Sequence, residues 1–138
     1  MLSWKRPDNL GVNHGRLAPC KRTPNCVSSQ ADAADREHYV APVPFKGSAL
    51  EAMVVAKRAV ESMQRATIVR EDRGYLYAEF RSKLLGYVDD VELAYDEKAG
   101  VFHVRSASRL GRRDFGVNRK RVETLRRILT SPSKPIPR

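Results

Sequence analysis

The middle of the chain contains three segments in which apolar and polar side chains alternate, residues 75–82, 88–95 and 101–108. Successive side chains of a β-strand point to opposite faces, so this alternation indicates strands with one apolar face each. Residues 67–71 give a fourth strand signal, and the turn residues 96–100 separate the last two segments. Because loops this short join antiparallel neighbours, the pattern predicts a four-stranded antiparallel β-meander.

The apolar residues of the last two segments also predict how these strands pair. Placing Tyr95 opposite Phe102 matches the apolar faces of both strands, whereas a shift of one residue would turn one apolar face to the wrong side. The same register places Glu92 opposite Arg105 and Asp90 diagonal to Arg105. Such cross-strand charge pairs contribute about 0.2–1 kcal/mol each, and their density here predicts an organised polar face.

An amphipathic helix is predicted on each side of the meander. Ser48 and Glu51 have the spacing of a capping box, and the apolar residues that follow recur at helical spacing to about residue 64. A second run of helical spacing begins at Val117 and ends near Thr130. With both helices packed on the apolar face of the sheet, the chain is predicted to have an α+β fold.

The chain is predicted to form one domain with a flanking segment at each end, since it has 138 residues. Residues 1–47 contain five prolines and three glycines, so they are predicted to be an irregular arm that packs on the domain through scattered apolar side chains. Residues 48–130 are predicted to form the compact α+β domain. The proline-rich residues 131–138 are predicted to be an extended tail.

Basic residues outnumber acidic ones by 26 to 16, which gives a formal net charge of +10. Such a balance attracts polyanions, among them nucleic acid, anionic membranes and acidic proteins. Nucleic acid is the less favoured partner, because no helix-turn-helix, zinc-finger or aromatic stacking motif is recognisable. No apolar run approaches the ~18 residues that a membrane-spanning helix needs.

The first residues, M-L-S-W-K-R-P-D, lack the apolar stretch of a secretory signal peptide. We therefore expect a cytoplasmic protein. Removal of an upstream leader would produce the same start, and in that case an oxidising compartment is expected instead.

Cys20 and Cys26 are separated by five residues of the arm. A disulfide between them would close a short loop and contribute about 2–3 kcal/mol in the chain-entropy model. A reversible redox pair and two small side chains that pack the arm onto the domain are the other interpretations. The spacing differs from that of familiar zinc sites and the chain has only three histidines, so we expect no metal and no cofactor.

The arginine-rich sequence around the last strand predicts an anion-binding site. Arginine presents a planar fork of donors that binds carboxylate or phosphate through two parallel bonds. The start of the second helix adds unpaired backbone N–H groups and the positive end of the helix dipole, and Asn118 would cap this helix or donate to the ligand. The candidate ligand-binding residues are Arg81, Arg105, Arg109, Asn118, Arg119 and Arg121.

Asp90 and Glu92 allow an enzymatic alternative, because they share a strand face beside these arginines, whereas Asp89 points to the opposite face. Two carboxyl groups can divide the roles of general acid and general base, and Cys26 is a candidate nucleophile. In the competing interpretation, which we favour, both acids neutralise arginines of the same face in a structural network.

Three blocks of sequence connect the chain with a known family. They are L-A-P-C-K-R-T-P-N-C-V-S-S-Q at 17–30, F-R-S-K-L-L-G-Y-V-D-D-V-E at 80–92 and V-R-S-A-S-R-L-G-R-R-D-F-G-V-N-R-K-R-V-E at 104–123. In these blocks the chain resembles the family called domain of unknown function 1499, over about residues 7–129. One departure is Arg112–Arg113, where the resemblance leads us to expect an aromatic and a small residue. The resemblance implies a single domain and highlights the same segments, and it implies no particular activity.

The sequence favours a non-enzymatic binding or accessory module for an anionic small molecule or an acidic protein partner. In such a module Arg105 and Arg109 would contact the anion, while Asp90 and Glu92 would hold these arginines in place. One alternative is an enzyme that uses the acidic pair. Another is an interaction or scaffold protein in which the arm and the tail carry the partner contacts.

Overall fold

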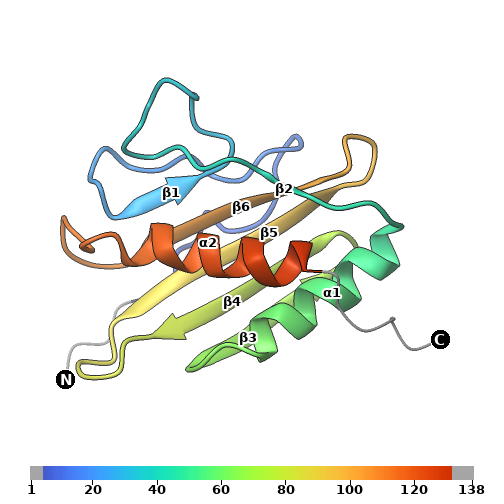
Figure 1. Ribbon diagram of the computed structural model, residues 1–138. Helices are drawn as coiled ribbons and strands as arrows, with labels where there is room; N and C mark the ends of the chain where they lie inside the picture. Colours follow the sequence, from blue (N-terminus) through green and yellow to red (C-terminus); the bar gives the residue numbers. More distant parts are fainter. Residues whose placement is uncertain (1–4, 132–138) are drawn as a thin grey trace.

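The computed structural model describes residues 5–131, which form a six-stranded antiparallel sheet with two helices on one face (Figure 1). Residues 1–4 of the arm, and the tail apart from Ser131, lie outside the described residues. The elements are β1 (Cys26–Ser28), β2 (Val43–Pro44), α1 (Ala49–Glu61), β3 (Ala66–Asp72), β4 (Tyr75–Arg81), β5 (Val88–Asp96), β6 (Val101–Ser108) and α2 (Val117–Thr130).

The meander predicted from the sequence is present as strands β3 to β6. Each strand pairs antiparallel with the next one along the chain. The predicted register of β5 and β6 is confirmed, with Tyr95 opposite Phe102 and Glu92 opposite Arg105. The apolar alternation determines this register, because one face of the sheet is buried in the core.

The sheet has six strands rather than the predicted four, because the arm adds two short strands along β6. In β1, Cys26 lies opposite Ala107, and in β2, Val43 lies opposite Phe102. These strands contain only 3 and 2 residues, so neither is long enough to show the alternation that identifies a strand in a sequence. The prediction of a wholly irregular arm is wrong at these two segments.

Both predicted helices are present and pack side by side on the apolar sheet face (Figure 1). The predicted capping box opens α1, where the Glu51 N–H donates to Ser48 Oγ at 3.1 Å and the Ser48 N–H donates to Glu51 Oε1 at 2.9 Å. This helix ends at Glu61 rather than near residue 64, because the following residues turn into β3. Within residues 5–131, neither helix combines the length and the apolar character that crossing a bilayer requires.

The hydrophobic core lies between the helices and the sheet. Each large aliphatic side chain that is fully buried there contributes about 1.5–3 kcal/mol. Three alanines of α1 let this helix approach the strands closely, and the opposite face of the sheet is left for the arm. The fully buried core residues include Ala52, Ala56, Ala59, Val60, Leu76, Val91, Leu93, Phe102, Val104, Val122 and Leu125.

Candidate functional site

The sheet face opposite the helices is polar, and the arm covers it. The Gly11 N–H donates to a carboxylate oxygen of Glu92 at 2.7 Å, and Leu17 packs in a small cluster with Tyr75 and Tyr77. Charged side chains of a sheet usually face water, but here the arm excludes water from them. The residues of this polar face, none more than 7% exposed, are Tyr75, Tyr77, Glu79, Asp90, Glu92 and Arg105.

Arg109 stands at the centre of one buried charge cluster on this face. Its Nε donates to Asp90 Oδ2 at 2.9 Å and its Nη2 donates to Asp90 Oδ1 at 2.8 Å, which is the two-pronged geometry of a strong pair. Nη2 also donates to Glu79, and the Tyr77 hydroxyl donates to Asp90. From the arm, Arg6 Nε donates to Glu79 Oε2 at 2.8 Å. The cluster therefore links β4, β5, the segment that follows β6 and the arm, and it occupies Arg109.

Within this cluster the pKa of Glu79 is strongly lowered, which favours its charged form. Hydrogen bonds from Arg6, and then from Arg109 and Tyr77, lower the pKa of Glu79 to about 2, although burial opposes the shift. The hydrogen bonds and charge of Asp90 and Glu79 raise the pKa of Arg109. Glu79 is a buried carboxylate with two guanidinium partners, so its role is to hold the arm and Arg109 together.

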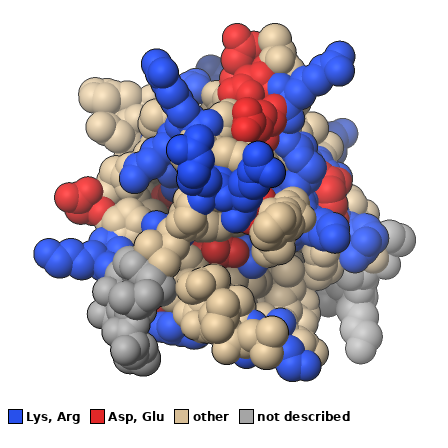
Figure 2. Space-filling view, turned by 90° about the vertical axis from the view of Figure 1, so that its left-hand side faces the viewer, with Lys and Arg blue, Asp and Glu red and all other residues tan. Residues whose placement is uncertain are grey.

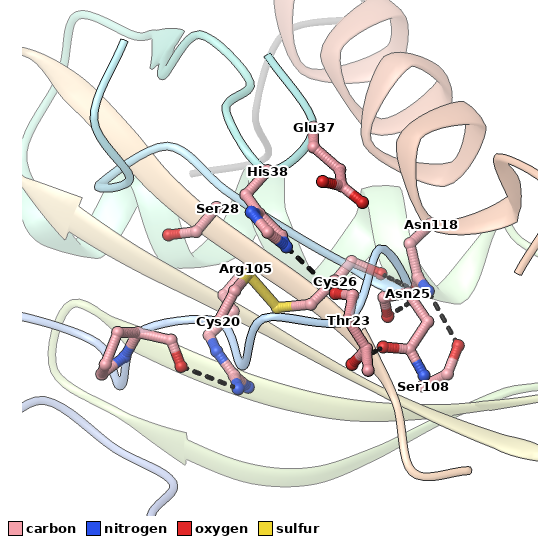
Figure 3. The surroundings of a disulfide bond; sticks show 12 residues. Cys20, Thr23, Asn25, Cys26, Ser28, Glu37, His38, Arg105, Ser108 and Asn118 are labelled. Atoms are coloured by element: carbon pink, nitrogen blue, oxygen red, sulfur yellow. Dashed lines mark hydrogen bonds between the residues drawn. A yellow bond between two sulfur atoms is a disulfide. The ribbon is translucent and has the colours of Figure 1, made fainter. Parts of the chain in front are cut away.

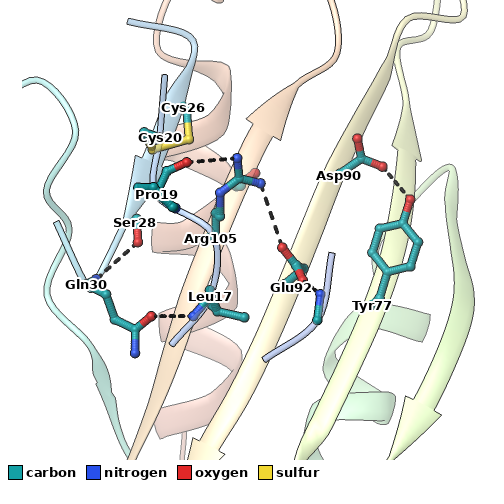
Figure 4. Close-up of polar contacts among 12 residues, drawn as sticks. Leu17, Pro19, Cys20, Cys26, Ser28, Gln30, Tyr77, Asp90, Glu92 and Arg105 are labelled. Carbon is teal, nitrogen blue, oxygen red and sulfur yellow. Dashed lines mark hydrogen bonds and ion pairs between the residues drawn. A yellow bond between two sulfur atoms is a disulfide. The ribbon is translucent and has the colours of Figure 1, made fainter. Parts of the chain in front are cut away.

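Arg105 is the second buried arginine of the face, and its pairing is incomplete (Figure 4). Its Nη1 lies 3.7 Å from Glu92 Oε1, beyond hydrogen-bond distance, and its Nη2 reaches the Pro19 carbonyl at 3.4 Å. Within the described part of the chain, neither Arg105 Nε nor Glu92 Oε1 has a hydrogen-bond partner. The other oxygen of Glu92 accepts from Gly11 and from the Tyr75 hydroxyl, at 2.7 and 2.5 Å. Burial lowers the pKa of Arg105, against the opposing charge of Glu92.

The side chain of Arg105 borders a pocket of about 470 Å³ between the arm and strands β5 and β6. Four basic and two acidic residues line this pocket, and one of the acids, Asp90, is already paired with Arg109. The lining is therefore positive. Its residues include Lys5, Asp8, Asn9, Lys21, Thr23, Asn25, Asp90, Arg105, Arg109 and Gly111.

A disulfide joins Cys20 to Cys26, with a Cα–Cα distance of 5.6 Å (Figure 3). It closes a loop that supplies Lys21, Thr23 and Asn25 to the pocket wall. The Asn25 side chain donates to the Gly111 carbonyl at 2.7 Å, so the loop is tied to the segment that follows β6. The disulfide removes the free thiol that a nucleophilic Cys26 would need.

Asn118 lies on the other side of the sheet, where it is completely buried at the start of α2 (Figure 3). Its side chain makes five hydrogen bonds that join α2 to β6 and to the disulfide loop, so it has no capacity left for a ligand. Its amide donates to the Asn25 carbonyl, Ser108 Oγ and Asp114 Oδ2 at 3.1, 2.9 and 2.7 Å, and its oxygen accepts from Ser106 Oγ and Arg121 Nη1 at 2.6 and 2.8 Å.

The predicted capping role of Asn118 is taken by its neighbours. Gly116 is the N-cap residue, and its φ of 80° lies in the left-handed region that favours glycine. The side chain of Asp114 accepts from the Gly116 N–H at 2.9 Å and from the Asn118 N–H at 3.0 Å. Since the Val117 N–H also donates to the Asp114 carbonyl at 3.1 Å, Asp114 occupies N–H groups at the start of α2 that a ligand would otherwise meet.

The structure does not bring the six candidate ligand-binding residues together. Arg105 and Arg109 lie on the polar face, whereas Arg121 lies on the helix side and pairs with Asp89 at 2.9 Å. Arg119 donates to three backbone carbonyls of the arm, and Arg81 is exposed at the end of β4. Strand alternation and the 100° turn per helical residue separate side chains that are close in sequence.

The groups considered for catalysis are also dispersed or occupied. Asp90 accepts from Arg109 and Tyr77, and Glu92 is fully buried. His103 does not line the Arg105 pocket and instead contacts Ser29 Oγ at 3.1 Å. Among residues 5–131, no three His, Cys, Asp or Glu side chains are arranged to hold a metal ion.

Sequence reasoning missed Tyr77 and Glu79 as partners of the arginines. The alternation of β4 places both on the polar face, and the β4–β5 register sets Glu79 opposite Asp90. This pairing of two acids on one face is the sequence signal that a cation must lie nearby. For Lys5 and Lys21 no sequence signal exists, because the path of an irregular segment across a sheet leaves no periodic pattern.

Replacing Asn118 with alanine should lower the free energy of unfolding by about 2–4 kcal/mol, because the change leaves several buried polar groups without partners. Urea denaturation measures this difference. Lys120→Ala on the exposed side of the same helix is the matched control, with an expected effect of at most about 0.5 kcal/mol. Equal effects of the two changes would contradict the structural role of Asn118.

The low pKa of Glu79 predicts a pH dependence of stability. The folded-state pKa of about 2 lies below the ordinary 4.5, so the stabilisation by Glu79 is fully present above about pH 4.5 and is lost as the pH falls towards 2. Glu79→Gln should therefore be less stable than the wild type at pH 7 and should lose less stability on acidification. Urea denaturation across this pH range checks it, with Glu97→Gln in the exposed β5–β6 turn as the control. A curve for Glu79→Gln as steep as that of the wild type would refute the assignment.

Compared with known protein families, residues 16–129 match the family described as "Protein of unknown function (DUF1499)". The matched segment includes the disulfide, the polar face of the sheet and nearly all of α2. No curated protein matches the chain. Since the match covers most of the chain, this protein belongs to the DUF1499 family.

Proposed function

We propose that this domain is a non-enzymatic binding module for a small anionic molecule, which occupies the pocket between the arm and strands β5 and β6. The observation that carries the proposal is the buried and incompletely paired guanidinium of Arg105 at the edge of this pocket. Arg109 provides the contrast, because the same face holds it in a two-pronged pair with Asp90.

A buried guanidinium is costly unless its donors are matched by acceptors. Among residues 5–131, Arg105 makes one weak hydrogen bond, to the Pro19 carbonyl, and a long contact to Glu92. A carboxylate or phosphate in the pocket would offer a charged acceptor to the part of Arg105 that lines it, and bonds between charged groups of this kind contribute about 1.5–3 kcal/mol. The guanidinium of Arg105 is thus available to donate to an anionic ligand.

The pocket also favours a class of ligand. Its volume of about 470 Å³ lies in the range of sites for small molecules. Lys5 and Lys21 add positive charge to the wall, while the amide of Asn9 offers neutral hydrogen-bonding groups. A carboxylic acid or phosphate ester of metabolite size fits this combination, and the acidic side chain of a partner protein is the alternative with the same chemistry.

The enzymatic alternative has less support than binding. General acid and base catalysis needs a titratable group within reach of a substrate. The carboxylate of Asp90 is engaged by two donors, Glu92 is completely buried, and the sulfur of Cys26 is part of a disulfide. Arg105 in the same pocket can bind an anion without any of these groups.

Titration with citrate and with glycerol 3-phosphate, followed by amide chemical shifts in NMR spectra, tests the proposal. We expect shifts that cluster at Asn9, Lys21 and Arg105 and that saturate with ligand. Arg105→Gln should weaken binding by about 10–100-fold, the equivalent of one charged hydrogen bond.

A second variant keeps the test valid if Arg105→Gln unfolds. Asn9→Asp adds a negative charge to the exposed wall of the pocket, so it should weaken anion binding while the melting curve stays unchanged. Lys98→Glu in the distant β5–β6 turn adds negative charge outside the pocket and should bind like the wild type. If neither probe shifts the pocket amides, or if Asn9→Asp binds both probes normally, the proposal is wrong.

A further inference from the structure

Large apolar side chains are exposed at the end of the molecule formed by residues 81–87 and 109–117, which we call the loop end. Leu84, Leu85 and Phe115 are 92%, 68% and 88% exposed. The two segments lie side by side, because one hollow is lined by residues of both. They form the left-hand end of the molecule in Figure 1, which faces the viewer in Figure 2.

The exposed position of Phe115 is fixed by its backbone. Its φ of 54° lies in the left-handed region, which an aromatic residue rarely adopts. The turn that imposes it is held by Asp114, which accepts from the N–H groups of Gly116 and Asn118. A strained conformation that turns a phenylalanine ring into solvent indicates a role outside the fold, because the core gains nothing from it.

Basic residues surround these apolar side chains. Arg81, Lys83, Arg112 and Arg113 are exposed, and none of them forms an ion pair with another described residue. The acids of the same region are occupied, since Asp89 pairs with Arg121 at 2.9 Å and Asp114 caps α2. Figure 2 shows Lys and Arg gathered around an area of other residues at this end.

We propose that the loop end docks on an anionic lipid surface, with Leu84, Leu85 and Phe115 inserted among the lipids and the four cations bound to headgroup phosphates. Apolar side chains within a basic border are the pattern of peripheral membrane binding. The side chains project outwards from two loops, so a protein partner would need a matching cavity, whereas a fluid bilayer accepts them without one. The net charge of +10 adds a long-range attraction to the same surface.

Binding of this kind depends on both contributions. Three inserted side chains provide too little apolar burial for permanent attachment, and four cations alone are screened by salt. Attachment should therefore be reversible, selective for anionic lipid and weakened by salt. Docking of the loop end does not require the Arg105 pocket to be occupied.

Co-sedimentation of the purified protein with lipid vesicles tests the proposal. We expect binding to vesicles of phosphatidylcholine mixed with phosphatidylglycerol and little binding to phosphatidylcholine alone. The double variant Leu84→Ser/Phe115→Asn should bind at least about tenfold more weakly, because it removes two inserted side chains. Asparagine suits the left-handed backbone at position 115. Lys83→Glu should weaken binding by about fivefold or more.

Two variants of the opposite end are the controls. Leu50→Ser removes an apolar side chain that is 76% exposed on α1, and Lys98→Glu reverses a charge in the β5–β6 turn. Both should bind vesicles like the wild type, and all variants should keep the wild-type melting curve. Absence of vesicle binding, equal binding to both compositions, or normal binding by the double variant would overturn the proposal. Self-association without lipid that the double variant abolishes would assign the loop end to a second copy instead.

Discussion

The pairing of Arg109 with Asp90 and Glu79 beneath the arm is the interaction on which the rest of the structure depends. It lets a sheet face with five charged side chains be buried instead of facing water, because the acids of one half of this face are matched by donors. Arg6 extends the cluster into the arm and so fixes the segment that covers the face. The position of the arm in turn determines where the disulfide loop, the pocket and the edge strands along β6 lie.

Arg105 and Arg109 lie on the same sheet face, and they differ in how completely their guanidinium groups are paired. Arg109 meets matching acceptors in Asp90 and Glu79, so its donors are used within the fold. Arg105 is buried to a similar degree, yet its opposite carboxylate lies at 3.7 Å and turns its other oxygen to Gly11 and Tyr75. Burial without full pairing is the physical reason for assigning Arg105 to a ligand and Arg109 to the fold.

The parts of the fold that follow from local pattern could be predicted from the sequence. Alternation in residues 88–108 determines the register that sets Glu92 opposite Arg105, and the spacing of Ser48 and Glu51 marks the start of α1. The cover over the polar face could not be predicted, because contacts such as Arg6 with Glu79 join residues 73 positions apart without periodicity. Alternation shows which face a side chain occupies, and it does not show what covers that face.

We propose that Arg105 serves anion binding rather than stability, and a double variant of Arg105 and Glu92 tests this proposal most directly. Arg105→Leu with Glu92→Gln replaces the pair by uncharged groups and keeps an acceptor for Gly11 and Tyr75. Urea denaturation and citrate titration of the same preparation give both quantities. We predict a free energy of unfolding within about 1 kcal/mol of that of the wild type, because removing both buried charges together leaves no unpaired ion, and we predict loss of citrate binding. A loss of several kcal/mol of stability, or citrate binding as in the wild type, would contradict the account.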